Sequence, residues 1–246
     1  MQVILNITDR CNLNCSYCRI PKGSNIMEWD TVIGAYSLIK DDDVSIGFYG
    51  GEPLLVPGRV ILAMEEAHIR FRQPRFNITT SGLYLTRSFL DLTADLDLRM
   101  TLSHDGTRQG ITRYSYMMDS QERADAAARM MLDYDPFSVA MCTYRPQDIF
   151  TLKEDVDYLT DLGFRYISLN PDSYRKDWDY GRLEEVLVSI IEDNKDIHFI
   201  NLESDSDCGD GNGFFVSTKG SIFPCISYSE IPKMCIGHVN FGIDRY

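Results

Sequence analysis

The sequence lacks a long hydrophobic run, and this absence argues against a membrane-spanning helix. Its longest apolar stretches, such as residues 32–39, are far shorter than the ~20 residues that cross a bilayer as a helix. The first residues also lack the basic region of a secretory signal peptide, and cysteines begin almost at once. We therefore expect a cytoplasmic protein with no membrane partner.

Positive charge is scarce as well. The chain of 246 residues has 24 Lys and Arg against 37 Asp and Glu, which gives a formal net charge of −13. A nucleic-acid surface requires clustered Lys and Arg, so no nucleic-acid partner is expected. The negative charge permits a basic peptide or a cationic small molecule as partner, although acidity often serves only solubility.

A fourth cysteine is missing beside the first three. Cys11, Cys15 and Cys18 have the spacing C-x3-C-x2-C, and the next Cys or His is His68. A structural zinc site or a closed iron–sulfur site takes four protein ligands. Three thiolates on one tight loop would instead hold a [4Fe–4S] cluster by three irons and leave the fourth iron open. A zinc knuckle and three unrelated thiols are the alternatives.

The other cysteines fit the same chemistry. The total of seven is odd, and the cysteines are grouped rather than spread. Such grouping indicates metal ligation in a reducing compartment rather than a disulfide framework.

Short β-prone runs alternate six times with segments of helical periodicity, which predicts a parallel sheet with helical crossovers. Six units are fewer than the eight of a closed barrel. We therefore expect an α/β fold, a partial (β/α)6 TIM-like barrel that is open on one side. The expected strands are 2–7, 44–49, 75–79, 98–103, 137–143 and 165–169, and the expected helices are 28–39, 58–71, 86–94, 121–134, 149–162 and 181–194.

The pattern breaks from about residue 197. Segments 213–217 and 221–225 are predicted to form a hairpin that turns at 218–220. We expect two domains, a barrel over residues 1–198 and a small hairpin-containing extension over 199–246. No linker separates them, so the extension should pack directly on the barrel.

Every unusual polar cluster follows a predicted strand. In α/β barrels the chemistry lies at the carboxyl ends of the strands. The three cysteines follow the first strand, and the remaining clusters are residues 50–53, 80–82, 103–106, 142–145 and 170–172. All of them are therefore expected on one rim of the barrel.

Two of these clusters resemble a known signature. The C-x3-C-x2-C loop with an aromatic residue before its last cysteine, and Gly50-Gly51-Glu52-Pro53 one strand later, resemble the radical S-adenosylmethionine (SAM) enzymes and their GGEP motif. The resemblance implies that Cys11, Cys15 and Cys18 hold a [4Fe–4S] cluster whose open iron binds SAM. It further implies an enzyme in which one electron, from a reductant such as a flavodoxin or ferredoxin, cleaves SAM to a 5′-deoxyadenosyl radical.

The resemblance also implies a SAM site at the rim. The two glycines allow a ligand to approach the backbone closely, so that carbonyls and the Glu52 carboxylate accept hydrogen bonds from the SAM ammonium. Arg113 is a candidate partner for the SAM carboxylate, with a solvated surface arginine as the alternative. An ordinary βα turn is the alternative for the GGEP segment. The implied SAM-binding residues are Tyr17, Gly50, Gly51, Glu52, Pro53, Ser81, Ser103, Asp105 and Arg113.

The C-terminal cysteines resemble the opening of the SPASM and twitch extensions of this superfamily. Cys208 and Cys225 stand in the pattern C-x11-G-x4-C, and Cys235 follows before the chain stops at Tyr246. The resemblance implies an auxiliary [4Fe–4S] cluster held by these three cysteines, with Cys142, Asp207, a water or the substrate as fourth ligand. A structural zinc site with His238 is the rival interpretation. Cys142 is otherwise expected as a small buried side chain.

The substrate is implied only by analogy. The chain resembles the anaerobic sulfatase maturases and other peptide-modifying members, which suggests hydrogen abstraction from a peptide or protein side chain. Ile226 stands where the maturases have an aspartate base, and because the first predicted strand begins at residue 2, no N-terminal leader-binding domain is expected. A small-molecule oxidation or rearrangement and a non-catalytic iron–sulfur or zinc protein are the alternatives. The candidate catalytic residues at the ends of the fifth and sixth strands are Tyr144, Arg145, Asn170 and Asp172.

Overall fold

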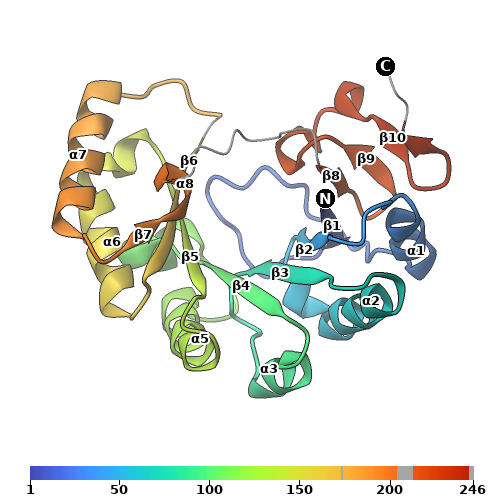
Figure 1. Ribbon diagram of the computed structural model, residues 1–246. Helices are drawn as coiled ribbons and strands as arrows, with labels where there is room; N and C mark the ends of the chain where they lie inside the picture. Colours follow the sequence, from blue (N-terminus) through green and yellow to red (C-terminus); the bar gives the residue numbers. More distant parts are fainter. Residues whose placement is uncertain (173, 204–212, 244–246) are drawn as a thin grey trace.

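The protein is built on one open, curved sheet with helices outside it. The computed structural model describes residues 1–172, 174–203 and 213–243. Its strand order is β11-β10-β9-β8-β1-β2-β3-β4-β5-β6-β7, and the two end strands do not pair with each other. Figure 1 shows the strands as the inner layer of an arc, with the longer helices along its outer side. An incomplete barrel is therefore confirmed.

The strands from β8 through β1 to β7 run parallel, and β8 to β11 pair antiparallel. The strands are β1 (Gln2–Thr8), β2 (Ser45–Gly50), β3 (Arg75–Thr80), β4 (Leu98–Ser103), β5 (Val139–Tyr144), β6 (Tyr166–Pro171), β7 (His198–Phe199), β8 (Gly213–Val216), β9 (Ser221–Phe223), β10 (Gly237–His238) and β11 (Gly242–Ile243).

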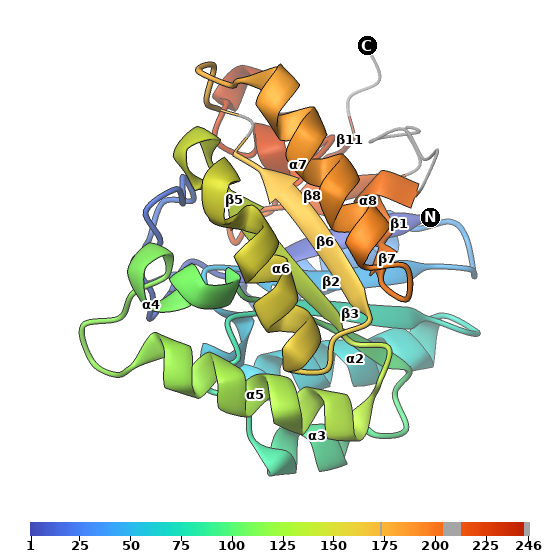
Figure 2. The same cartoon turned by 90° about the vertical axis from the view of Figure 1, so that its left-hand side faces the viewer.

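The helices follow the strands in the predicted order, and Figure 2 shows α6 and α7 along β6, with α5 below them. They are α1 (Trp29–Ser37), α2 (Pro57–Arg70), α3 (Arg87–Thr93), α4 (Gln109–Thr112), α5 (Ser120–Tyr134), α6 (Leu152–Asp161), α7 (Tyr180–Asp193) and α8 (Ile200–Glu203). Five 3₁₀ turns complete the described elements: η1 (Pro53–Leu55), η2 (Gly106–Arg108), η3 (Pro146–Thr151), η4 (Ile226–Tyr228) and η5 (Pro232–Met234).

Local sequence sets where the helices begin. The Thr86 hydroxyl accepts a hydrogen bond from the Phe89 amide at the start of α3, and the Asp119 carboxylate accepts from two amides at the start of α5. Pro57 is the first residue of α2, a position whose N–H has no acceptor within the helix, so the N–H that proline lacks is not needed. Each of the six predicted helices lies within a few residues of its predicted bounds.

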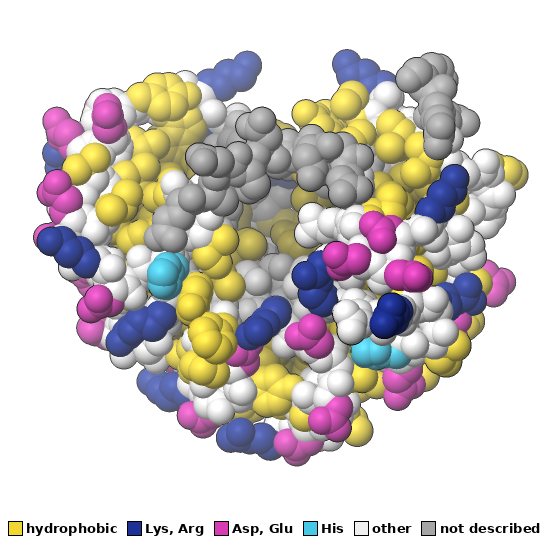
Figure 3. Space-filling model, in the orientation of Figure 1, with side chains coloured by type: hydrophobic (Ala, Val, Ile, Leu, Met, Phe, Trp, Pro, Cys, Tyr) yellow, Lys and Arg dark blue, Asp and Glu magenta, His cyan; other side chains and the backbone are white. Residues whose placement is uncertain are grey.

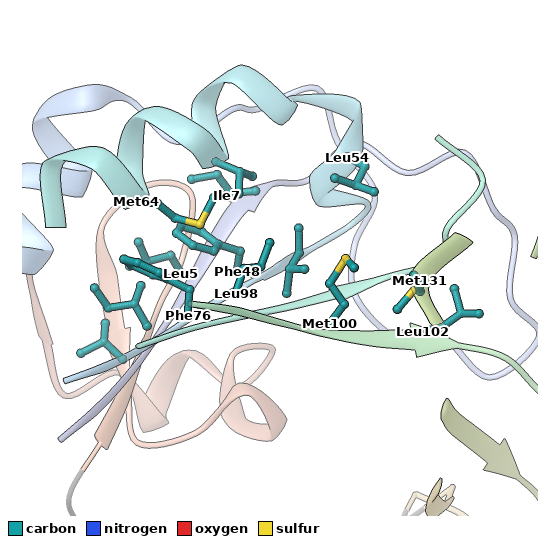
Figure 4. Packing of buried hydrophobic residues seen from close by; sticks show 14 of the residues in the cluster. Leu5, Ile7, Phe48, Leu54, Met64, Phe76, Leu98, Met100, Leu102 and Met131 are labelled. Atoms are coloured by element: carbon teal, nitrogen blue, oxygen red, sulfur yellow. The ribbon is translucent and has the colours of Figure 1, made fainter. Parts of the chain in front are cut away.

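The core lies between the sheet and the outer helices. Figure 4 shows side chains of the first four strands, among them Ile7 and Phe48, packed beneath α2 and its Met64. Ile7 and Met64 are fully buried, and Phe48 is 1% exposed. Removing a buried side chain of this size costs roughly 2–5 kcal/mol, so this layer fixes the positions of the strand ends that carry the site.

The hairpin joins the sheet instead of only packing on it. β8 pairs in parallel with β1, from Gln2 opposite Gly213 to Leu5 opposite Val216. The predicted hairpin is present as β8 and β9. Its junction with β1 was not expected from the sequence, because backbone pairing between segments so far apart leaves no local pattern. None of the helices in the described ranges is long and apolar enough to cross a membrane.

Candidate active site

A cavity of about 330 Å³ lies at the carboxyl ends of the parallel strands. It brings together most of the residues predicted from the sequence. Of the predicted residues, its walls contain Cys11, Cys15, Tyr17, Cys18, Gly50, Gly51, Glu52, Ser81, Ser103, Arg113, Asn170 and Asp172. A second hollow, of about 700 Å³, lies at the opposite ends of the strands near His68 and Arg72 and holds none of them.

The cysteine loop presents alternate side chains to the cavity. Leu13, Cys15 and Tyr17 line it, whereas Asn14 and Ser16 are exposed on the outer side. The loop backbone pairs with the end of α4 and the residues just after it, because the Asn14 amide donates to the Tyr114 carbonyl at 2.9 Å and the Ser16 amide to the Thr112 carbonyl at 2.8 Å. The loop is therefore held by its backbone while its thiols face inward.

The thiols fit a cluster with one open position. Burial raises the pKa of Cys11, and it raises that of Cys15 to about 11, so ligation would release protons from these thiols. Within the described ranges, no three Cys, His, Asp or Glu side chains are gathered closely enough for a single metal ion. A zinc ion takes four protein ligands, whereas three thiolates suffice for a [4Fe–4S] cluster with an open iron. Ligation of a cluster by Cys11, Cys15 and Cys18 stays a prediction.

Gly51 supports the cysteine loop. Its amide donates to the Thr8 carbonyl at 2.7 Å, and the Glu52 amide donates to the Arg10 carbonyl at 2.7 Å. A Cβ added to Gly51 would collide with the Arg10 carbonyl. The glycine is therefore required by the backbone next to Cys11, in addition to any requirement set by a bound ligand.

The Glu52 carboxylate is occupied by protein donors. Oε1 accepts from the Leu54 amide at 3.0 Å and the Thr80 hydroxyl at 2.6 Å, and Oε2 accepts from the Ser81 amide at 2.7 Å and the Ser81 hydroxyl at 2.5 Å. Four donors match the roughly four acceptor positions of a carboxylate. This differs from the expectation that Glu52 accepts from an ammonium. Its role here is to join the ends of β2 and β3.

Asp105 and Arg113 form a buried pair beside Tyr17. Arg113 Nε lies 3.0 Å from Asp105 Oδ1, although without the alignment of a hydrogen bond. Asp105 Oδ2 accepts from Tyr17 and from Thr112, both at 2.6 Å. Burial raises the Asp105 pKa, but Arg113 and these hydrogen bonds outweigh it, so the pKa lies below its usual value. The carboxylate therefore stays ionised.

Arg113 is 7% exposed, and its guanidinium lies 5.2 Å from the centre of the Tyr17 ring. The alternative of a solvated surface arginine is therefore wrong. Burial lowers its pKa, but Asp105 more than compensates, so the pKa lies above its usual value. Nε and Nη2 make its contacts with Asp105, Met141 and Thr143. Binding of a SAM carboxylate by Arg113 stays a prediction.

The four catalytic candidates separate into two pairs. Asn170 and Asp172 line the cavity. Tyr144 is 2% exposed and packs against Trp178, with ring centres 5.6 Å apart. Side chains alternate along a strand, so Thr143 lines the cavity and Tyr144 turns to the other face. Arg145 pairs with Asp148 at 2.8 Å and donates to the Ser16 hydroxyl at 3.0 Å, which places it as a support of the cysteine loop.

Pro53 is also outside the cavity. It opens η1 and is buried, so its position is that of a turn residue behind Glu52. Ser81 and Ser103 both line the cavity wall.

Sequence reasoning missed the partners of two buried side chains, Arg108 and His104. Arg108 contacts Asp155 at 2.6 Å and Asp148 at 3.0 Å, which ties η2 to the segment around α6. His104 Nε2 lies 2.9 Å from Asp125 Oδ1. The partners are far apart in the chain, so no local spacing indicates them.

The extension forms part of the cavity wall, through Ile226, Ser227, Ser229 and Glu230. The Tyr174 hydroxyl donates to the Ser227 carbonyl at 3.0 Å. On the same ring, the Arg19 guanidinium lies 4.7 Å from the centre. The cysteine loop, the segment after β6 and the extension therefore meet at Tyr174.

The C-terminal cysteines are only partly described. Cys208 and Asp207 lie outside the described residues, Cys225 is half-buried and Cys235 is exposed. His238 Nε2 lies 2.9 Å from the Lys219 carbonyl, and Nδ1 accepts from the Asn240 amide at 3.2 Å. Neither ring nitrogen is free for zinc in this conformation. Cys142 is fully buried, as expected for a core side chain.

Comparisons with known proteins agree with this geometry. The sequence model of the radical SAM superfamily matches residues 5–135. An uncharacterized protein of Methanocaldococcus jannaschii is 26% identical over 97% of this chain and 88% of its own length. A GTP 3′,8-cyclase of Streptomyces coelicolor is 34% identical, but over 44% of this chain and 33% of its own length.

Solved structures share the fold. The structure of anSMEcpe with bound AdoMet and a peptide matches with a TM-score of 0.80 and 18% identity, over 97% of this chain and 77% of that one. SuiB of Streptococcus suis bound to precursor peptide SuiA matches with a TM-score of 0.69 and 16% identity, over 95% of this chain and 61% of that one. At these identities the likeness shows the partial-barrel fold alone.

Proposed function

The chain belongs to the radical SAM superfamily and is an enzyme, and we propose that it cleaves SAM reductively in the cavity at the strand ends and abstracts hydrogen from a peptide or protein side chain. The superfamily implies a [4Fe–4S] cluster and SAM as cofactors. Their assignment to Cys11, Cys15 and Cys18 and to the cavity wall is part of the proposal. So are a cytoplasmic location, a flavodoxin- or ferredoxin-like reductant, and the absence of nucleic-acid and membrane partners.

One observation carries the proposal: a single cavity unites the cysteine triplet, the Gly50–Gly51–Glu52 backbone and the polar ends of β4 and β6. When bound, the cluster and SAM supply a one-electron reduction and a 5′-deoxyadenosyl radical. The side chains and backbone of the protein would hold and orient these bound groups. The three thiols face one space, and Asp105 fixes Arg113 and Tyr17 beside it. Leu13, Ile20 and Met141 contribute an apolar wall that limits access of water.

Asn170 and Asp172 are the proposed substrate-orienting groups. Both line the cavity. Asp172 Oδ1 accepts from the Tyr174 amide at 3.2 Å, and among the described residues Oδ2 has no hydrogen-bond donor, so we propose it for a substrate donor. The Asn170 amide donates to Ser168 at 3.1 Å, which leaves its carbonyl as an acceptor. A peptide backbone or an amide side chain offers donors of this kind.

A nucleoside triphosphate fits this wall less well than a peptide. Arg113 is already paired with Asp105, and within the described ranges the other cation lining the cavity is Arg19. The same wall contains the carboxylates of Glu52, Asp172 and Glu230. A triphosphate would need several cationic partners, so the partial similarity to GTP 3′,8-cyclases supports the shared superfamily rather than the same substrate.

An auxiliary [4Fe–4S] cluster on Cys208, Cys225 and Cys235 completes the proposal. Its support is positional. Ile226 and Ser227 follow Cys225 directly and line the cavity, so a metal group held by Cys225 would lie next to the substrate side. Hydrogen abstraction from a substrate leaves an unpaired electron that such a group could accept.

The test is anaerobic reconstitution with iron and sulfide, followed by incubation with SAM and dithionite. We expect 5′-deoxyadenosine from the wild-type protein and none from the variant with Cys11, Cys15 and Cys18 all changed to Ala. Cys142→Ala is the matched control, because Cys142 lies outside the cavity wall. Production of 5′-deoxyadenosine by the triple variant would contradict the assignment.

A further inference from the structure

The cavity wall carries negative charge that the described part of the protein does not neutralise. Of the three carboxylates in this wall, that of Glu52 is satisfied by four donors, which leaves those of Asp172 and Glu230. On the face shown in Figure 3, acidic and basic side chains are interspersed, so acidity by itself does not mark a site. What distinguishes Asp172 and Glu230 is that neither forms an ion pair with another described residue.

Asp172 is a buried carboxylate with one oxygen left over. The residue is 8% exposed and lines the cavity. Oδ1 accepts from the Tyr174 amide at 3.2 Å. Oδ2 has no donor within the described ranges and is not enclosed by protein atoms, so it is open to the cavity. A buried carboxylate oxygen without a donor is costly, and a ligand that brings a donor to it is favoured.

Glu230 brings the second carboxylate from the extension. It is exposed and lines the same cavity. The Tyr174 hydroxyl donates to the Ser227 carbonyl at 3.0 Å, so the turn that carries Asp172 is joined to the segment that carries Glu230. In Figure 1 the strands before these two segments, β6 and β9, lie on opposite sides of the opening of the arc. A ligand between the two carboxylates would therefore lie at the open side of the barrel.

Two arginines near these carboxylates are engaged elsewhere. Arg113 lines the cavity, but its Nε lies 3.0 Å from Asp105. Arg175 follows the β6 end closely in the chain, but it contacts Asp177 at 2.6 Å. Neither is therefore the missing partner of the cavity carboxylates.

Arg19 is the remaining arginine in the cavity wall. Its guanidinium lies over the Tyr174 ring, 4.7 Å from the ring centre, and makes no ion pair in the part of the chain that the structure describes. Arg19 therefore offsets at most one of the two carboxylates. Ligation of the three cavity thiols as thiolates would add negative charge to the same wall. A ligand with a positive charge is consequently favoured on this side of the cavity.

We propose that Asp172 and Glu230 form a subsite for a basic side chain, Lys or Arg, of a peptide substrate. The inference rests on the proposed function and names the substrate class of the same cavity. The two carboxylates would anchor the cationic side chain at the open side of the barrel, while a neighbouring side chain of the peptide reaches toward the cysteine loop. An ammonium or a guanidinium carries several N–H donors, enough to contact both carboxylates. Hydrogen bonds between ionised partners are roughly twice as strong as neutral ones.

The experiment measures peptide binding separately from chemistry. The probes are two pools of labelled peptides with blocked ends and uncharged residues at all positions except the central one. The central residue is Lys in one pool and norleucine, which has the same chain length without the ammonium, in the other. Binding to reconstituted protein with SAM and no reductant is followed by fluorescence anisotropy.

The test variant is Asp172→Asn/Glu230→Gln. It preserves the size of both side chains and, at position 172, an oxygen for the Tyr174 amide. Its control is Glu192→Gln/Asp196→Asn, which removes the same two charges at exposed positions outside the cavity wall.

We expect the wild type to bind the Lys pool at least about tenfold more tightly than the norleucine pool, the factor typical of a charge-assisted hydrogen bond. In the test variant this ratio should fall to less than about threefold, because the remaining bonds are neutral. The control should keep the ratio of the wild type. Glu230→Gln alone, at an exposed position that does not hold the Tyr174 turn, should lower the ratio part of the way.

Equal affinity of the wild type for the two pools would overturn the subsite. So would a preference for Lys that persists in the test variant or falls equally in the control, because charge elsewhere would then produce it. SAM affinity, measured by calorimetry, is the remaining check: a loss by the same factor in the test variant would show that the carboxylates serve SAM instead. Absence of 5′-deoxyadenosine from the wild type with dithionite would remove the proposed function, and this outcome is read independently of peptide binding.

Discussion

The two cysteine regions of the chain differ in the number of described contacts that hold their cysteines in place. The N-terminal loop is held by backbone hydrogen bonds to the segment after α4 and by Gly51 and Glu52, and its three thiols line one cavity. In the C-terminal region, Cys235 is exposed and donates to the Gly237 carbonyl at 3.2 Å, and Cys225 follows the end of β9 on a half-buried stretch. Among the described residues, the N-terminal loop is therefore held in place before any metal binds, whereas fewer contacts position Cys225 and Cys235, so a metal proposed there would have to order its own site.

A buried carboxylate joins the elements of the first region. Asp105 is fully buried and joins Tyr17, Thr112 and Arg113, so the cysteine loop, α4 and β5 share one carboxylate. Removing one charged member of such a network leaves its partner buried without compensation. The described part of the C-terminal region has no comparable buried carboxylate, and the following changes test whether this contrast is real.

Gly51→Val should have the largest effect. Its side chain would collide with the Arg10 backbone, displace the cysteine loop and abolish SAM cleavage. Iron analysis should show loss of the iron bound by the loop, while any iron at the C-terminal region remains.

Gly58→Val is the matched control, because a Cβ there meets nothing within 4 Å. If Gly51→Val keeps all its iron but loses SAM binding in calorimetry, the glycine serves ligand access alone, as first expected from the sequence.

Asp105→Ala should destabilise the fold. It leaves Arg113 buried without its carboxylate, and breaking such a pair costs about 3–5 kcal/mol. The free energy of unfolding in urea measures the loss. Asp43→Ala removes a pair at 2.6 Å whose side chains are 61% and 71% exposed, and we expect a loss of only ~0–1 kcal/mol. Similar losses of unfolding free energy in both variants would show that the buried Asp105 network contributes no more to stability than an exposed ion pair.

The C-terminal region should hold about half of the iron. Two [4Fe–4S] clusters require about eight irons per chain, and changing Cys208 and Cys225 to Ala should leave about four. His238→Ala should leave the metal content unchanged, because both ring nitrogens contact backbone groups. Zinc in the wild type that disappears in His238→Ala would support the structural-zinc interpretation instead.

The smallest expected effect is a change in how the free energy of unfolding depends on pH when Asp125 is replaced. Burial raises the pKa of Asp125, but hydrogen bonds from His104 and Tyr158 outweigh it, so the pKa lies below its usual value. A lowered carboxyl pKa gives stability that is complete above the unfolded value, near 3.8, and is lost as the pH falls through the folded value. Asp125→Asn should therefore show a shallower loss of unfolding free energy below pH ~4. An identical pH profile would contradict this contribution.

Much of the fold could be predicted from residues close together in the chain. The alternation of β-prone and helical segments predicted six parallel strands, and caps such as Thr86 and Asp119 fixed helix starts. The cysteine spacing and the Gly50–Gly51–Glu52 segment predicted which residues line the cavity. Short-range patterns succeed here because strand and helix periodicity and tight loops are local properties.

The sequence by itself therefore determined the superfamily, the partial barrel and the rim on which the site lies. Only the tertiary structure decided that Thr143 and not Tyr144 faces the cavity. It also decided that donors at the end of β3 occupy the Glu52 carboxylate, and that the extension forms part of the cavity wall that contains Asp172. These features depend on which face of a strand is turned inward and on which distant donors meet one carboxylate. Contacts between segments tens to hundreds of residues apart leave no spacing in the sequence from which they can be read.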